Sequence, residues 1–236
     1  MTKQDFIESI ALGLELYRKD YGINVLSVPI AQAILESGFG TTELAVNAHN
    51  YFGLKCGSSY IGERYTKETC EEINGIVIKV QDNFRKYRSL RESCKGYLEF
   101  LNYSRYSNLK GITDYRLYLD NIVADGYATD SKYKLKILNI IGTYHLTDYD
   151  CISVSDKDLE TLITETLIGL YGKGNTRKEL LGCYYVTVQF YINTLYKTVR
   201  GDYGNGKERK EKLTSLGVDY NIIRNIINKG VIKIWN

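Results

Sequence analysis

An internal repeat in the C-terminal third of the chain is the feature that most constrains its fold. The pattern Gly169-x-Tyr171-Gly172-x-Gly174-x-x-Arg177-Lys178-Glu179 recurs as Gly201-x-Tyr203-Gly204-x-Gly206-x-x-Arg209-Lys210-Glu211, at an offset of 32 residues. Downstream, Gly182, Tyr185, Ile192 and Asn193 recur as Gly217, Tyr220, Ile227 and Asn228, at an offset of 35 residues. Each copy predicts a helix, a Gly-rich turn, a basic helix, a turn and a helix. So short a unit buries little apolar surface alone, so the copies either pack together or form minimal three-helix bundles.

Two amphipathic segments open the chain. The first carries apolar residues at helical spacing, namely Phe6, Ile7, Ile10, Ala11 and Leu14. The second predicts a helix with Ser27 as its N-cap, Pro29 in its first turn and Gly38 at its end. Glu36 lies in the last turn of this mostly apolar helix, where the helix dipole favours cations rather than anions. An acid in so unfavourable a place requires another explanation.

Residues 69–80 predict a β-hairpin, because Asn74-Gly75 is the preferred two-residue turn and apolar residues flank it. Helical periodicity returns in three later segments, at 97–101, 117–123 and 135–141. The first domain is therefore expected to be mostly helical with one β insertion.

A short stretch without periodicity follows this domain and predicts a linker. We expect a mainly α (α+β) protein: a helical domain with a β-hairpin lobe, followed by a small all-α repeat module. The expected boundaries are a first domain at 1–147, a linker at 148–157, and repeats at 158–194 and 195–236.

The composition excludes several classes of protein. Hydrophobic residues at 44% and charged residues at 25% are ordinary for a soluble globular chain. No apolar run reaches the roughly 18 residues that a membrane span needs, and Asp5 and Glu8 precede any apolar stretch, unlike in a secretory signal. The cysteines (Cys56, Cys70, Cys94, Cys151 and Cys183) are odd in number and lack a CxxC spacing. We therefore expect reduced thiols, no metal and no cofactor.

The charge is uneven along the chain. Residues 151–236 hold 13 Lys+Arg and 9 Asp+Glu, whereas the rest of the chain is close to neutral. A basic C-terminal third suits an anionic polymer, either cell wall or nucleic acid. A solvated surface is the plainer interpretation, and we expect no nucleic-acid partner.

Two separated motifs surround Glu36 in an order and spacing that resemble a known family. The segment Leu35-Glu36-Ser37-Gly38-Phe39-Gly40 is followed by Asn47-Ala48-His49-Asn50-Tyr51-Phe52-Gly53. The sequence resembles glycoside hydrolase family 73, the peptidoglycan endo-β-N-acetylglucosaminidases with a lysozyme-like α core. Residues 69–75 with 83–87 resemble the family's β-lobe, and residues 126–133 resemble its late tyrosine motif, with Ser131 where the family usually has Pro. The resemblance spans about residues 1–147.

The chemistry of glycoside cleavage accounts for these residue types. The leaving oxygen must be protonated and an oxocarbenium-like transition state supported. A Glu set against apolar neighbours keeps its proton near neutral pH, and the resemblance implies that Glu36 is this acid. It also implies Glu71 as the β-lobe carboxylate, with Glu72 as the alternative, and Tyr127 as a functional tyrosine. If the hairpin closes over the cleft, Glu71 activates water; if the hairpin stays remote, the substrate's own acetamido group assists.

The resemblance also suggests which residues contact the sugar. We expect Asn50, Tyr51, Phe52 and Tyr133 to bind substrate, with aromatic core packing as the alternative for Tyr51 and Phe52. His49 is interpreted as a structural hydrogen-bonding residue. Because the chain has only 2 His, a zinc amidase or a Cys-His peptidase lacks the residues it needs.

The C-terminal repeats resemble the Cpl-seven-type cell-wall-binding repeat of phage lysozymes. The resemblance implies binding of peptidoglycan muropeptide, and the candidate contacts are Arg177, Tyr203, Arg209 and Tyr220, since Arg suits carboxylates and Tyr suits sugars. The first copy departs from the pattern at Lys173, where Asn is usual. The glycines have a backbone interpretation as well, because they permit a turn with positive φ.

These observations together predict an endolysin-type hydrolase that cleaves the β-1,4 bond after N-acetylglucosamine in peptidoglycan. The expected partner is the bacterial cell wall, with neither nucleic acid nor membrane, and the oligomeric state is open. We expect synthesis in a host cytoplasm and action at the wall, with a virion-borne lysin or an exported autolysin as alternatives. The enzymatic alternative is a lytic transglycosylase or muramidase. The alternative from another class is a non-catalytic wall-binding tail protein.

Overall fold

The chain forms two compact units in the computed structural model, Met1–Thr147 and Asp148–Asn236. The structure describes residues 1–73, 76–150, 158–182 and 184–232. The side chains of 69–73 and 76–78 are not part of that description. The expected Asn74-Gly75 turn and most of the expected linker therefore lie outside the described residues.

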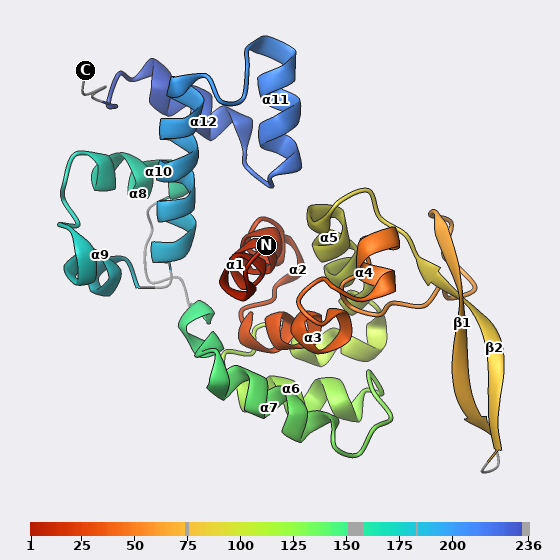
Figure 1. The fold of residues 1–236 in the computed structure, drawn as a ribbon. Coiled ribbons are helices and arrows are strands. Elements are labelled where there is room, and N and C mark those ends of the chain that lie inside the picture. Colours follow the sequence, from red (N-terminus) through yellow and green to blue (C-terminus); the bar gives the residue numbers. More distant parts are fainter. Residues whose placement is uncertain (74–75, 151–157, 183, 233–236) are drawn as a thin grey trace. The chain divides into compact units, whose positions relative to one another are not determined.

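The first unit is a helical body that carries a β-hairpin, as the sequence predicts (Figure 1). Its elements in order are α1 (Lys3–Glu15), α2 (Arg18–Tyr21), α3 (Ser27–Ser37), α4 (Glu43–Ala48), β1 (Arg64–Ile73), β2 (Ile76–Arg85), α5 (Leu90–Leu101), η1 (Ser104–Leu109), α6 (Tyr115–Ala124) and α7 (Tyr133–Thr143), with η2 (Leu146–Tyr149) at the unit boundary. Helix α3 packs against α1, α6 and α7, and α1 packs against α5. The apolar stripe of the first helix lies fully in this core.

Helix α3 positions the predicted acid, and one end of it differs from expectation. The N-cap is Leu26, and Ser27 is the first helical residue rather than the cap. Residues 27–34 are all buried, so packing in the core, not a polar cap, sets where the helix begins. Pro29 lies in the first turn as predicted, and Gly38 ends the helix in the left-handed conformation at φ 54°.

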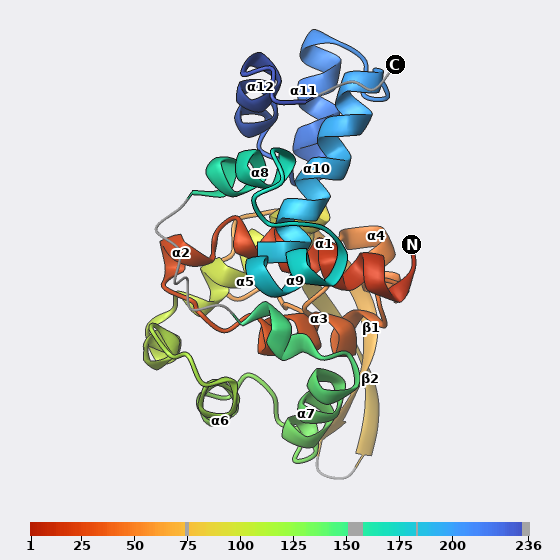
Figure 2. The same ribbon diagram turned by 90° about the vertical axis from the view of Figure 1, so that its left-hand side faces the viewer.

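The hairpin is longer than the predicted 69–80. Strands β1 and β2 pair antiparallel from Arg64↔Arg85 to Ile73↔Ile76. At the base of the hairpin, Tyr65 and Phe84 pack against α4 in a small apolar cluster with Leu44 and Ala48. This tertiary burial explains why pairing continues into polar sequence that carries no local strand signal. Figures 1 and 2 show the two strands running side by side along their length.

The second unit is entirely helical over its described residues and is built around one long helix. Its helices are α8 (Leu159–Leu167), α9 (Gly174–Leu181), α10 (Tyr184–Arg200), α11 (Gly206–Ser215) and α12 (Tyr220–Asn228). Helix α10 contacts α8, α9 and α12, and the expected boundary between the copies, 194/195, falls inside it. Glu160 of α8 pairs with Lys229 at 2.6 Å and accepts from Asn225 of α12 at 3.0 Å. The copies therefore pack together, which was one of the two arrangements that the repeat allowed.

Candidate active site

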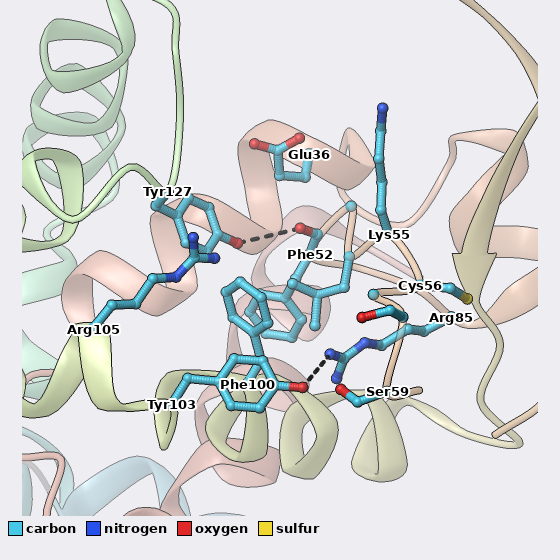
Figure 3. Close-up of a pocket in the computed structure, with 14 residues that line it drawn as sticks. Glu36, Phe52, Lys55, Cys56, Ser59, Arg85, Phe100, Tyr103, Arg105 and Tyr127 are labelled. Atoms are coloured by element: carbon cyan, nitrogen blue, oxygen red, sulfur yellow. Dashed lines mark hydrogen bonds between the residues drawn. The ribbon is translucent and has the colours of Figure 1, made fainter. Parts of the chain in front are cut away.

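A pocket of about 480 Å³ opens in the first unit beside the end of α3 (Figure 3). Its walls come from the end of α3, the loop at 52–59, the end of β2, α5, the segment that begins η1, and the loop after α6. The lining side chains that matter for its chemistry are Glu36, Lys55, Arg85, Phe100, Tyr103, Arg105 and Tyr127. Glu36 is the one carboxylate among the described residues that line this pocket.

Glu36 points into the pocket from the last turn of α3, with the loop at Gly53 directly against it. Gly53 has a φ of 65°, and a Cβ placed on it would come within 3.1 Å of the Glu36 Oε2 atom. The sequence predicts a Glu buried among apolar neighbours, whereas the side chain reaches solvent through the pocket. A glycine at position 53 thus permits both the turn and the close approach to the acid.

The surroundings of Glu36 favour its protonated form. Desolvation by nearby protein atoms raises the pKa of the Glu36 carboxyl above its usual value, and the positive charge of Lys136 partly opposes this rise. A carboxyl group whose pKa is raised and that opens into a pocket suits the role of a general acid.

Tyr127 lies in the same pocket and is held as a neutral donor. Its hydroxyl donates a hydrogen bond to the Phe52 carbonyl oxygen at 3.2 Å. Desolvation, with smaller contributions from Tyr133 and Glu36, raises the pKa of Tyr127 well above its usual value. The structure therefore brings together Glu36, Tyr127 and the loop at Phe52, all of which the sequence nominated.

Tyr133 has a different place from the one expected. It is buried, and its hydroxyl accepts from the Gln32 amide Nε2 at 3.1 Å. The Tyr97 hydroxyl donates to the Gln32 Oε1 atom. Because Gln32 lies one helical turn before Glu36, this buried network fixes α3 rather than contacting the pocket directly.

Asn50 and Tyr51 also lie outside the pocket lining. The Asn50 amide donates to the Leu54 and Arg85 carbonyl oxygens at 2.9 Å and 2.8 Å, and its Oδ1 accepts from the Leu54 N–H at 3.0 Å. Tyr51 is buried, and its hydroxyl bonds the His49 Nδ1 atom at 3.1 Å. These residues shape the loop that meets Glu36 and tie it to the base of the hairpin.

The second carboxylate stays a prediction. Glu71 pairs with Ile78 in the hairpin, and its side chain lies outside the described residues. Along β1, Glu71 lies seven positions from Arg64 toward the tip of the hairpin, and the strand partner of Arg64, Arg85, lines the pocket. At about 3.3 Å per residue, the Glu71 backbone is roughly 23 Å along the strand from that level. Its neighbour Glu72 pairs with Val77, one position further from the pocket.

Sequence reasoning missed the wall of the pocket opposite Glu36. Arg85 ends β2, Phe100 lies in α5, Tyr103 immediately precedes η1, and Arg105 lies in its first turn. Arg85 belongs to the stretch at 83–87 that resembles the family's β-lobe, so a signal for it existed. Phe100 lies in the predicted helical segment at 97–101, whereas Tyr103 and Arg105 lie in a stretch for which the sequence predicted no element.

The repeat arginines have equivalent structural roles in the two copies. The Arg177 Nε donates to the Gly172 carbonyl oxygen at 3.0 Å, and the Arg209 Nε donates to the Gly204 carbonyl oxygen at 2.9 Å. Both glycines have positive φ, at 63° and 71°. Each arginine therefore closes the Gly-rich turn five residues before it. The other candidates, Tyr203 and Tyr220, are partly exposed.

Metal sites, thiols and membrane-spanning helices were considered over the described residues. They contain no group of His, Cys, Asp and Glu able to hold a metal ion, and Cys56 and Cys94 are free thiols. Within the same part of the chain, no helix combines the length and the apolar character needed to cross a membrane.

A helical body with a hairpin lobe and an acid at a helix end defines a lysozyme-like hydrolase fold. Residues 14–146 match the glucosaminidase family, described as mannosyl-glycoprotein endo-beta-N-acetylglucosaminidase. Residues 197–231 match the CW_7 repeat. Because the first match spans more than half of the chain, the chain belongs to the glucosaminidase family, glycoside hydrolase family 73.

Relatives agree with this membership. The exo-glucosaminidase LytG of Bacillus subtilis is 33% identical over 164 residues, which cover 67% of this chain and 57% of that protein. An autolysin of Enterococcus faecalis is 34% identical over 137 residues, 52% of this chain and 18% of that protein. The chain thus spans little more than half of the first relative and under a fifth of the second.

Solved structures agree as well. The catalytic domain of the autolysin Auto from Listeria monocytogenes is 32% identical with a TM-score of 0.54, covering 63% of this chain and 87% of that one. A mutant peptidoglycan hydrolase from Sphingomonas sp. A1 is 27% identical with a TM-score of 0.53, covering 61% and 95%.

Proposed function

We propose that this chain hydrolyses the β-1,4 bond after N-acetylglucosamine in bacterial peptidoglycan, with Glu36 as the general acid. The observation that carries the proposal is the Glu36 carboxyl, which opens into a pocket while desolvation raises its pKa. A carboxyl group whose pKa is raised, beside a cavity of about 480 Å³, is suited to deliver a proton to the leaving glycosidic oxygen. Relatives named as peptidoglycan hydrolases and as a glucosaminidase support the choice of substrate.

The proposed mechanism uses Glu36 as the acid and either the substrate's acetamido group or Glu71 as the second participant. Glu36 protonates the leaving oxygen and then, as a carboxylate, supports the positive charge that develops at the sugar. Tyr127 stands beside it with a neutral hydroxyl, suited to hold the N-acetyl group of the substrate. As the bond to the leaving oxygen breaks, the acetamido oxygen bonds to the reacting carbon to give an oxazoline, which water then opens to release the reducing sugar. If the hairpin closes instead, Glu71 activates water for direct attack on that carbon.

The test is hydrolysis of purified peptidoglycan by the wild-type chain and by Glu36→Gln, with products identified by mass spectrometry. We expect N-acetylglucosamine at the new reducing ends. The variant should lose about 10²- to 10⁴-fold in rate, the usual contribution of a general acid. Glu99→Gln is the matched control, because Glu99 is an exposed helical carboxylate outside the pocket lining.

The products also separate the rival activities. Anhydro-muramic acid ends would indicate a lytic transglycosylase, and reducing muramic acid ends a muramidase. Glu36→Gln cleaving as fast as Glu99→Gln would exclude Glu36 as the acid. Absence of cleavage by the wild-type chain, with retained wall binding, would favour the non-catalytic alternative. A rapid fall in glycan length would support the endo mode over release from chain ends.

We infer that the second unit holds the enzyme on the wall. The CW_7 match and the paired Gly-rich turns support this role. A Tyr203→Ser/Tyr220→Ser variant should co-sediment less with intact walls than the wild-type chain, while its cleavage of soluble glycan fragments is unchanged. Tyr196→Ser is the control, because Tyr196 is 45% exposed on α10 and is not a candidate contact. Equal sedimentation of all the variants would remove both tyrosines from the wall contact.

The endolysin and virion-lysin assignments stay predictions of the sequence, as does the place of synthesis. A lysis assay from inside the cell, with and without a pore-forming protein expressed together with this chain, tests them. Lysis that depends on the pore-forming protein is the result expected of an endolysin.

A further inference from the structure

The wall of the pocket opposite Glu36 is cationic. Arg85 and Arg105 both line the pocket, and the Phe100 ring lies beside both of them. The Arg85 guanidinium carbon is 5.4 Å from the centre of that ring, and the Arg105 guanidinium carbon is 5.5 Å from it. Figure 3 shows the two arginines and the acid around one cavity.

Arg85 is nearly buried without a counter-ion. It is 5% exposed, and no carboxylate among the described residues pairs with it. Its Nε atom has no hydrogen-bond partner, its Nη2 donates a long bond, 3.4 Å, to the Tyr103 hydroxyl, and its other polar neighbour is the neutral Tyr87 hydroxyl. The neighbouring cation Lys55, in contrast, pairs with Asp82 at 2.6 Å.

A buried, unpaired guanidinium is costly, because its charge has lost water and gained no opposite charge. The face of the Tyr60 ring, at 4.8 Å, and the Phe100 ring offset part of this cost through cation–π attraction. The ring faces also fix the plane of the guanidinium. An arginine held in this way is preorganised for an anion that arrives with a ligand.

We propose that Arg85 and Arg105 bind a carboxylate of the substrate, carried on the muramic acid next to the cleaved bond. This inference rests on the proposed function. N-acetylglucosamine is neutral, whereas muramic acid bears a lactyl ether that ends in a carboxylate or continues into a peptide with carboxylates of its own. A planar carboxylate matches the fork of a guanidinium. The site would therefore recognise which sugar occupies this side of the pocket.

The position of the arginines is compatible with the chemistry at Glu36. A cation close to the acid would favour its charged form, and the cation whose charge lowers the pKa of Glu36 is Lys136 of α7. Neither arginine is among the causes that shift the pKa of Glu36, so the two can hold an anion without opposing its raised pKa.

The test measures affinity with Glu36→Gln as a non-cleaving background. Three ligands are titrated by calorimetry: a tetrasaccharide with stem peptides, the same glycan stripped by an amidase so that its lactyl carboxylates are free, and a neutral N-acetylglucosamine tetramer. Adding Arg105→Gln should weaken carboxylate-bearing ligands about tenfold or more and the neutral tetramer less than about twofold, as expected for charge-assisted hydrogen bonds. Arg105 is exposed, so this variant is expected to fold.

Two further variants make the result decisive. Arg116→Gln is the matched control, because Arg116 is exposed and stacks on Tyr115 at 5.3 Å outside the pocket lining. Arg85→Lys keeps the charge but removes the fork, so it should weaken the same ligands selectively. Loss only with the stem-bearing ligand assigns the peptide carboxylate; loss with the stripped glycan assigns the lactyl carboxylate.

Other outcomes would overturn the inference. Equal losses on all three ligands would mean that the arginines only support the pocket, and no loss on any ligand would mean that they contact none of it. If the wild-type chain cleaves peptidoglycan in either case, the proposed function survives. If it does not cleave, the proposed function itself fails, and the carboxylate site fails with it.

Discussion

Replacing Gly53 by alanine should slow catalysis by Glu36 without unfolding the protein. The added Cβ would lie 3.1 Å from the Glu36 Oε2 atom, closer than an ordinary van der Waals contact, so the carboxyl must move by a few tenths of an ångström. Since a displacement of about 1 Å can cost 10²-fold in rate, we expect about a tenfold fall in kcat. The methyl group also desolvates the carboxyl further, so the pKa of Glu36 should rise.

The backbone strain of this change can be measured separately. Gly53 has a φ of 65°, and an L-residue there costs about 1–2 kcal/mol. For a chain of this size that corresponds to a Tm lower by roughly 2–8 °C. Gly111→Ala is the matched control, because Gly111 has a φ of 78° and no atom within 4 Å of a Cβ placed on it. It should lose similar stability and keep wild-type kcat.

The assay is the pH dependence of kcat on soluble glycan fragments, together with Tm from calorimetry. A general acid is active while protonated, so activity falls as pH rises through its pKa, and a raised pKa moves this fall to higher pH. If Gly53→Ala and Gly111→Ala have the same kcat and the same alkaline limb, the close contact with Glu36 has no catalytic meaning. A rise in KM alone would instead show that the methyl group only obstructs the substrate.

Three further predictions follow from the same geometry. Lys136→Met removes the charge that opposes the raised pKa of Glu36, so the alkaline limb of the activity profile should move to higher pH in a pH titration. Tyr127→Phe loses the bond to the Phe52 carbonyl, which should cost about 1 kcal/mol of stability in denaturant unfolding; a fall in kcat of more than tenfold would show that the hydroxyl also acts on substrate. Glu71→Gln should reduce kcat less than tenfold if the acetamido group assists, and far more if the hairpin closes.

The helices of the first unit could be predicted because their signals are local. The apolar stripe beginning at Phe6 and the stop at Gly38 are both read from consecutive residues, and both appear where expected. The start of α3 could not be predicted in the same way. Ser27 has the chemistry of an N-cap, but burial of the first turn places it inside the helix. Packing in the core, rather than the N-cap preference of serine, therefore determines where this helix begins.

The site was only half predictable for a similar reason. Glu36 and Tyr127 were predicted from motifs. Arg105, in contrast, lies in a short 3-10 helix without periodicity, and only the tertiary fold brings it to the pocket that Glu36 lines. Asn50 illustrates the reverse case. A polar residue within a functional motif was interpreted as a substrate contact, yet its amide makes three hydrogen bonds to the backbone. A sequence motif indicates which residues are important for function. It does not distinguish a residue that contacts the ligand from a residue that positions such a contact.

The same distinction applies to the repeats. Arg177 and Arg209 were chosen as candidates because arginine suits carboxylates. In the structure, the Nε atom of each donates a hydrogen bond to a glycine carbonyl oxygen five residues earlier. The Gly-to-Arg spacing shared by the two copies therefore has a structural role, because it allows the arginine to close a turn with positive φ. Any ligand must use the guanidinium edges that remain, or the tyrosines nearby. Since the two copies share α10 and close on each other through Glu160 and Lys229, substitutions at these arginines should be judged first by stability and only then by wall binding.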